Sequence, residues 1–261
     1  MLRAISVFLV LLAAASPALT QDKMAAQDKI VSQDEVAAQS ELAEASAAQA
    51  VLIAPVLDTG ASFDARHAAC LRLIGRNPEA ALEAAMIWTG RGGGHRARHC
   101  EAMALFANGH PAEAGYRLDA VVETLPREDA EFRRMAVNYG TEAAQAWLQA
   151  GELERCYASA TRVLELDPAA VEARVTRARL YFGLDRIEDA ETDLTSVLAF
   201  RPDHAQALRF RADARLRLGE LAAALEDANA ALALAPSVDT ALVRGHIREA
   251  MAERAATKDT P

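Results

Sequence analysis

The residues of this chain that could bind a metal gather near position 100. His95 and His99 are one helical turn apart and Cys100 follows directly, so two imidazoles and a sulfur could share a metal ion. No carboxylate completes a recognisable ligand set, and partial ligand patterns often arise by chance. Surface histidines without a metal are the favoured interpretation. A protein that handles a metal or small ligand with these three residues is the alternative.

A glycine-rich run lies just before these histidines. Gly90-Arg91-Gly92-Gly93-Gly94 precedes an expected helix, as a phosphate-binding loop would. It lacks the Gly-Lys-Ser/Thr ending and no strand is expected before it, so a flexible loop between helices is the simpler interpretation. No nucleophile with a base and an orienting partner stands out, nor do paired carboxylates. The sequence therefore predicts a protein that is not an enzyme and uses no cofactor.

The charge of the chain limits its partners. The 28 basic and 37 acidic residues give a formal net charge of −9 at pH 7. An acidic chain repels phosphate backbones, which argues against nucleic acid as the main partner. Few aromatic residues and many alanines favour close contacts between helices over a bulky core.

The first twenty residues have the parts of a secretory signal peptide. Arg3 supplies the early positive charge, an apolar run covers 4–15, and small residues precede a polar stretch. Cleavage after Ala18 or after Thr20 is left open. A membrane-spanning helix needs about 20 apolar residues, so we expect cleavage without stable membrane insertion. The chain is predicted to be periplasmic or secreted, with residues 1–20 as the signal.

Residues 21–61 are expected to form a low-complexity spacer. Six-residue repeats start at Gln21, Gln27, Gln33 and Gln39. Six residues do not match the 3.6-residue helical period, so the apolar pairs drift around the helix. A docking or oligomerising helix is the alternative, although no heptad pattern supports it. An apolar patch at 51–57 would lie against the first packed helices.

A period of 34 residues organises the rest of the chain. Leu166-Asp167-Pro168, Phe200-Arg201-Pro202 and Leu234-Ala235-Pro236 recur at this interval, which is typical of stacked helical repeats. Small residues fall wherever the two helices of a pair must cross, and a turn signal lies between them. The crossing residues are Ala69, Ala102, Ala144, Ala178 and Ala212 on the first helices, and Ala81, Ala114, Cys156, Ala190 and Ala224 on the second. The turn signals are Gly75, Gly109, Gly151, Asp185 and Gly219.

This pattern resembles the tetratricopeptide repeat family, of the exported bacterial type, from about residue 62 to 236. Trp147 and Tyr181 match an aromatic late in the first helix of the repeat, and Pro126, Pro168, Pro202 and Pro236 match a closing proline. The resemblance implies an all-α, right-handed α-solenoid of about five helix pairs, at 62–94, 95–128, 129–170, 171–204 and 205–238. A capping helix and tail would follow at 239–261. The 42-residue spacing from Pro126 to Pro168 predicts one longer helix.

The resemblance also implies a concave groove, lined by the first helix of each pair, that binds a peptide or protein. The groove residues carried over are Arg96, His99, Met103, Phe106, Gln145, Arg179, Phe182, Arg209 and Arg217. Arginines outnumber acids on this surface, which favours an acidic or carboxylate-bearing partner because Arg binds carboxylates in a two-pronged fashion. The alternative is that these arginines are solvated or paired with neighbouring acids.

The three cysteines make an odd count. By the repeat register, Cys156 replaces a buried alanine and is expected to stay reduced. Cys70 and Cys100 fall on the first helices of neighbouring pairs. A disulfide between them would add about 3–4 kcal/mol if it forms without strain. The sequence leaves open whether it forms.

Overall fold

The computed structural model describes residues 37–41 and 43–258, and the predicted signal peptide lies outside them. The chain divides into two units, Met1–Leu52 and Ile53–Pro261. In the first unit, the described residues 37–41 and 43–52 are helical and nearly all exposed. Among the described residues, no helix is both long and apolar enough to cross a bilayer.

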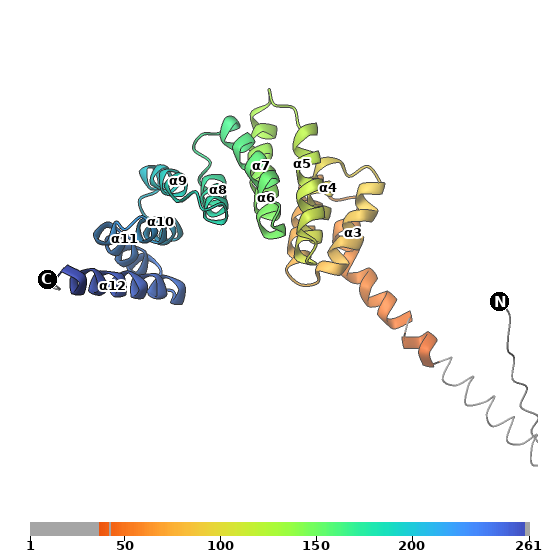
Figure 1. Cartoon of the computed structure of the whole chain (residues 1–261). Coiled ribbons are helices and arrows are strands. Elements are labelled where there is room, and N and C mark those ends of the chain that lie inside the picture. Colours follow the sequence, from red (N-terminus) through yellow and green to blue (C-terminus); the bar gives the residue numbers. More distant parts are fainter. Residues whose placement is uncertain (1–36, 42, 259–261) are drawn as a thin grey trace, which may run out of the picture. The chain divides into compact units, whose positions relative to one another are not determined.

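The second unit is a succession of helix pairs (Figure 1). The pairs are α2 (Phe63–Ile74) with α3 (Pro78–Gly90), α4 (Gly94–Ala107) with α5 (Pro111–Thr124), α6 (Ala130–Ala150) with α7 (Leu153–Leu166), α8 (Val171–Gly183) with α9 (Ile187–Phe200), and α10 (Ala205–Arg217) with α11 (Leu221–Leu234). A last helix, α12 (Val238–Lys258), follows. No strand occurs in the described part of the chain, so the predicted all-α stack of five helix pairs with a terminal helix is confirmed.

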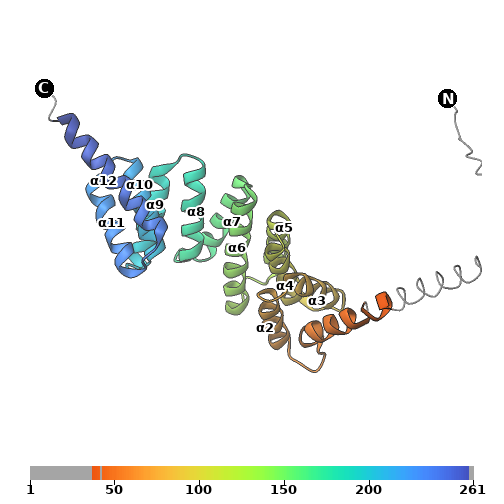
Figure 2. The ribbon, with the colours of Figure 1, turned by 90° about the horizontal axis from the view of Figure 1, so that it is seen from below.

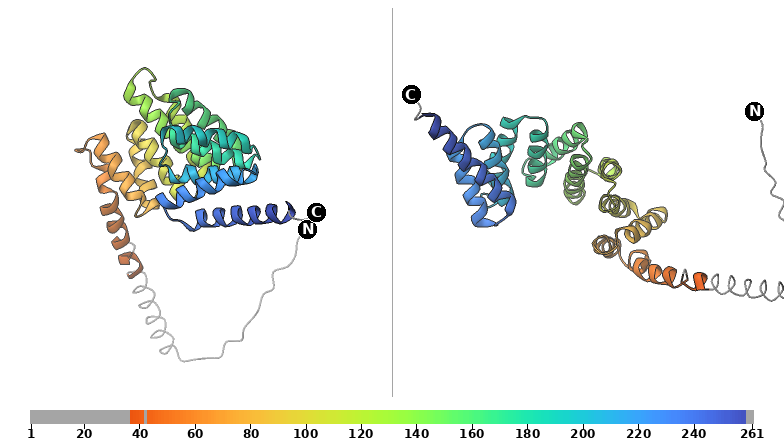
Figure 3. Two further views of the ribbon diagram at one scale, coloured as in Figure 1. Left: turned by 90° about the vertical axis from the view of Figure 1, so that its left-hand side faces the viewer. Right: turned by 60° about the horizontal axis from the view of Figure 1, so that its bottom comes forward.

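Each helix packs against the next one along the chain, and first helices of neighbouring pairs also touch. Direct contacts join α2 to α4, α6 to α8 and α8 to α10. Figures 2 and 3 show the successive pairs side by side in this order. The first helices therefore form one row, and the residues that they share across each joint can form a continuous surface.

The predicted crossing residues explain how the helices approach so closely. All of them are buried, and Cys156 is fully buried among the alanines of this series. A larger side chain at these points would push the axes apart. Gly115 shows the same constraint at another contact, because a Cβ there would lie 2.7 Å from the ring of Trp147.

The turns follow the expected signals. Gly151 and Gly219 adopt φ values of 76° and 78°, in the left-handed region that ends many helices. Asp185, which stands at the same place of the fourth pair, takes φ 56° and is the only non-glycine residue described with a positive φ. Its short polar side chain tolerates this conformation better than most. The weakest turn signal of the sequence thus still marks a real turn.

The insertion before Pro168 lengthens α6 to 21 residues, whereas α8 and α10 have 13 each. Its added turns are packed: Phe132 and Met135 lie against the buried cluster formed around Leu118 and Tyr139. The insertion therefore enlarges the contact between the second and third pairs.

Packing begins before the repeat region at residue 62, as the apolar patch at 51–57 predicts. A helix covers 43–57, and its residues Ile53 and Val56 are buried in the cluster that contains Trp88 of α3. Arg66 of α2 donates from Nε to the carbonyl of Val56 over 2.7 Å. Part of the segment 21–61 thus covers the first pair, because α2 and α3 alone would leave this apolar face in water.

Candidate functional site

Two adjoining cavities lie along the row of first helices. One has a volume of about 540 Å³ and the other about 490 Å³, and Gln145 and Glu172 line both. Their walls come from α4, α6, α8 and α10, with the loops before α8 and α10. The first cavity also includes Asn138, Thr141, Glu142 and Arg201; the second also includes Phe106, Leu148, Gln149, Arg179 and Gln206. Together they form a groove with the volume and mixed polarity of a ligand site.

Several residues predicted for the groove do line it. Phe106, Gln145 and Arg179 are in its wall. Met103 is half-buried instead, packed against the cluster that includes Leu118. The remaining predicted residues divide into a group beyond the groove on α8 and α10 and a group at the joints of α2, α4 and α6.

The group on α8 and α10 is an arginine–phenylalanine cluster, formed by Arg179, Phe182, Arg209, Phe210 and Arg217. The two rings have centroids 6.2 Å apart. The guanidinium of Arg209 lies 4.1 Å from the centroid of Phe210, that of Arg179 lies 5.9 Å from the same centroid, and that of Arg217 lies 5.1 Å from Phe182.

Charge in this cluster is only partly balanced. Arg217 meets Asp213 at 3.4 Å. Within the described residues, no ion pair neutralises Arg179 or Arg209. Since Arg179 also lines the groove, the cluster places positive charge at the end of the groove nearest α10.

The predicted groove residue Arg96 is committed elsewhere. Its Nε donates to Asp64 at 2.6 Å, its Nη2 lies 3.5 Å from Glu131, and only 17% of its side chain is exposed. For this arginine the alternative interpretation, pairing with neighbouring acids, is the correct one. Asp64 on α2 and Glu131 on α6 are thereby tied to α4.

His99 is buried and links three helices. Its Nδ1 lies 2.8 Å from Nε2 of His67 on α2, and its Nε2 lies 2.6 Å from Glu142 on α6. A carboxylate accepts, so His99 donates from Nε2 and its Nδ1 accepts the Nε2 hydrogen of His67. Its ring stacks on Tyr139 with centroids 3.9 Å apart. Burial and then the neighbouring His99 lower the pKa of His67 to about 4, and burial raises the pKa of Tyr139 to about 12.

The metal alternative, built on His95, His99 and Cys100, is wrong in its ligand set. Cys100 forms a disulfide with Cys70, with Cα atoms 6.2 Å apart, so its sulfur is already bonded. His95 packs edge-on against Phe132 with centroids 5.5 Å apart. No cluster of three or more potential ligands occurs among the residues that the structure describes.

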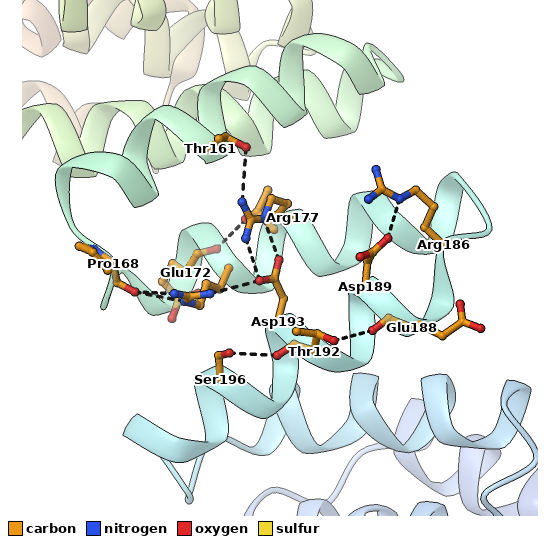
Figure 4. A network of polar contacts seen from close by, with 12 residues as sticks. Thr161, Pro168, Glu172, Arg177, Arg186, Glu188, Asp189, Thr192, Asp193 and Ser196 are labelled. Atoms are coloured by element: carbon orange, nitrogen blue, oxygen red, sulfur yellow. Dashed lines mark hydrogen bonds and ion pairs between the residues drawn. The ribbon is translucent and has the colours of Figure 1, made fainter.

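A polar network that sequence reasoning missed holds α8, which carries Arg179 and Phe182. Arg177 donates from Nε and Nη2 to the two oxygens of Asp193 on α9, at 2.7 and 2.8 Å, and from Nη1 to Thr161 on α7 at 3.4 Å (Figure 4). Arg211, Asp227 and Thr195 repeat this arrangement one pair later. The signal was present, since all three residue types recur at 34 residues.

Comparison with known proteins agrees with this architecture. The family model described as tetratricopeptide repeat matches residues 148–213. A stack of helix pairs with a groove along the first helices is a repeat protein of the α-solenoid class. Over residues 148–213 the chain matches the tetratricopeptide-repeat family, and the helix pairs on either side continue the same architecture.

Solved structures share the fold at low identity. MamA of Desulfovibrio magneticus RS-1 is 17% identical, with a TM-score of 0.55 over 68% of this chain and 95% of that one. A tetratricopeptide repeat protein of Parabacteroides merdae is 19% identical, with a TM-score of 0.53 over 61% and 60%. YrrB, described as having an unusual peptide-binding site, is 14% identical, with a TM-score of 0.50 over 67% and 89%. No curated protein matches the chain.

Proposed function

We propose that this protein is a non-enzymatic scaffold that holds a peptide or protein segment in the groove. The observation that carries the proposal is the pair of cavities that share Gln145 and Glu172. Side chains of successive residues in an extended segment could occupy them in turn. A related fold, that of YrrB, is described with a peptide-binding site, which supports the same use of the surface.

The partner segment is acidic where it meets α8 and α10. The support is the arginine–phenylalanine cluster, in which Arg179 and Arg209 form no ion pair with a carboxylate of the described residues. A partner carboxylate would bind these guanidinium groups bidentately, and the rings would cover its apolar neighbours. The acidic surface of the whole chain would repel such a segment elsewhere and so favour this one place.

The scaffold works outside the cytoplasm, in the periplasm or secreted. The signal pattern of residues 1–20 supports this location. So does the bond between Cys70 and Cys100, because disulfides persist mainly in oxidising compartments.

Crosslinking in the native compartment tests the proposal. A photo-crosslinking residue placed at Gln149 or Gln206, both in the groove wall, should capture a partner, whereas one at the exposed Arg76 should not. Changing Arg179, Phe182 and Arg209 together to Ala should abolish the capture at Gln206. The control changes Arg76, Tyr116 and Arg248, which are all exposed, to Ala and should preserve it. Equal capture by both triple variants would rule out the cluster as the docking site.

A further inference from the structure

Two links connect α2 to α4, the first helices of the first two pairs: a disulfide and a hydrogen-bonded histidine pair. The disulfide joins Cys70 of α2 to Cys100 of α4, and both cysteines are fully buried. One turn away, Nε2 of His67 lies 2.8 Å from Nδ1 of His99. The two links fix both the distance between α2 and α4 and their register along the helix axes.

A chain of contacts leads from this joint into the groove. His99 holds Glu142 of α6 at 2.6 Å, and Glu142 lines the larger cavity. Arg96 runs a parallel bridge from Asp64 of α2 to Glu131 of α6. The position of the groove wall at α6 therefore depends on where α2 and α4 hold His67 and His99.

Besides these two links, the first pair is held by residues 53–57 and by the ion pair of Asp64 with Arg96. It stands at one end of the five pairs, where a repeat has only one neighbouring pair. Of α2, only Arg66, Ala69, Cys70 and Leu73 are buried. Without the disulfide, α2 would separate from α4 more easily, and His99 would then lose the hydrogen-bond donor that orients it.

We infer that oxidation of Cys70 and Cys100 completes the groove, so that the chain becomes competent to bind only in an oxidising compartment. This rests on the proposed function for its consequence, but the structural step stands on its own. Each thiol gives up one proton and one electron, and the new bond joins the two Sγ atoms. A disulfide-bearing oxidant takes up both electrons and both protons and becomes two thiols.

Because the two cysteines are buried, the disulfide forms during folding and is protected from reduction afterwards. An oxidant reaches the thiols while α2 and α4 are still apart, during folding. Once the bond has formed, both sulfurs are shielded from attacking thiolates. The disulfide thus forms once, after export, and then persists. Before export, the reduced chain has a groove whose wall at α6 is not yet held in place.

Hydrogen exchange of the full chain tests the inference without any partner. Oxidised chain is compared with chain that has been reduced with a phosphine while unfolded and then refolded, and with Cys70→Ala/Cys100→Ala. In both forms that lack the disulfide we expect protection in α2 and in the first half of α4 to fall by about 100-fold, the range that loss of a disulfide implies. Protection of residues 139–145 in α6 should fall with it, by roughly tenfold, the effect of losing one buried hydrogen bond. Protection in α8, α9, α10 and α11 should stay the same.

His67→Ala separates the two links. It keeps the disulfide, so α2 and α4 should stay protected while residues 139–145 lose protection. Cys156→Ala removes the remaining cysteine and should change neither region. Unchanged exchange in α6 of the reduced chain would overturn the inference, and so would a loss that spreads equally through α8 to α11 or global unfolding. If the groove binds no partner, the proposed function fails while these exchange results stand.

Discussion

Cys156 combines burial with an unreactive thiol. It is fully buried, and burial raises its pKa to about 11, an effect that the charge of Arg179 partly opposes. The thiolate is the reactive form, so almost none is present at neutral pH. We expect a thiol reagent to find no reactive cysteine in the folded chain, one after denaturation, and all 3 after denaturation with reduction. A reactive thiol in the folded chain would contradict this packing, and three thiols on denaturation alone would show that the disulfide is absent.

His67 should make stability depend on pH. Its folded pKa of about 4 lies below the ordinary value of 6.5, because burial and the neighbouring His99 and Arg96 disfavour its charge. The unfolded chain therefore binds a proton near 6.5 that the folded chain refuses until about 4. Stability is full above the unfolded pKa, falls as pH drops through this window, and levels off below it.

Urea midpoints at several pH values measure this effect. The comparison is clearest between about pH 7 and pH 5, where few carboxylates titrate. His67→Gln keeps a donor toward His99 but cannot take up a proton, so the variant should lose less stability than the wild type over this range. Equal losses in the two proteins would mean that His67 is not the group responsible.

For single residues, the sequence predicted which side chains make specific contacts better than it predicted the partners of those contacts. Cys156 was predicted as a buried small residue because the repeat register fixes its position. His99 and Arg96 were placed in the groove by the same register, yet both turn into the joints. Their partners, Glu142 and Glu131, lie on α6, and the inserted turns that carry Glu131 have no counterpart in the regular repeat. A register alone could not reveal contacts made by an insertion.

Among the elements, one pair of facing positions recurs in every helix pair, and several different residue types fill it. The first-helix position holds Ala68, Glu101, Ala143, Arg177 and Arg211; the facing second-helix position holds Ala84, Arg117, Ser159, Asp193 and Asp227. Arg–Asp pairs fill it in the last two helix pairs, and the charges are exchanged in the second, where Arg117 meets Glu101 at 2.6 Å. The basic residue can lie on the first or on the second helix of the pair, because a buried charge is stable as long as it has an oppositely charged partner.

Removing one member of such a pair should be costly. Asp193 is buried and accepts from both Arg174 and Arg177, whose side chains are 19% and 17% exposed. Asp193→Ala would leave two mostly buried guanidinium groups without their carboxylate. We expect a loss of about 3 kcal/mol in the free energy of unfolding, measured by urea denaturation.

The matched control lies one turn away on α9. Asp189 pairs with Arg186 at 2.6 Å, but both side chains are about half exposed (Figure 4). Asp189→Ala should leave the unfolding free energy unchanged, because water replaces the lost partner. A similar loss in both variants would show that burial does not decide the value of these ion pairs.

The helices themselves were largely predictable, and their added contacts were not. Crossing alanines, turn glycines and closing prolines each mark a place where the backbone must come close, reverse or stop, so they leave a local signal. The contact of Arg66 with Val56 leaves none, because it joins a repeat to a segment outside the period. The apolar patch at 51–57 predicted that the end of the segment 21–61 packs on the first pair, but not which residues it contacts there.

Over the whole molecule, stability should follow the nearest-neighbour order of a stack. Each pair is held by the pairs beside it, so an end can open while the middle stays folded. The period of 34 residues predicted this architecture directly. The period does not predict which segments cover the two ends of the stack, because terminal segments depart from the repeat. One end is covered by residues 53–57 and the other by α12.

At the second end, Ile247 fastens α12 to the stack. It is fully buried against Ala212 of α10 and Ala224 and Ala228 of α11, whereas most of α12 is exposed. Ile247→Asp would place an unpaired charge in this apolar contact, which costs more than the helix gains by docking. We expect α12 to detach, to lose its protection from hydrogen exchange, and to expose apolar surface that binds a reporter dye. Protection should fall modestly in α10 and α11 and remain unchanged in α8 and α9, because each pair depends chiefly on its neighbours.

Leu242 on the same helix is 56% exposed, so Leu242→Asp should have none of these effects. Cooperative loss of protection through α8 and α9 in the Ile247 variant would show that the stack unfolds as one block. It would contradict the prediction that one end can open while the rest stays folded.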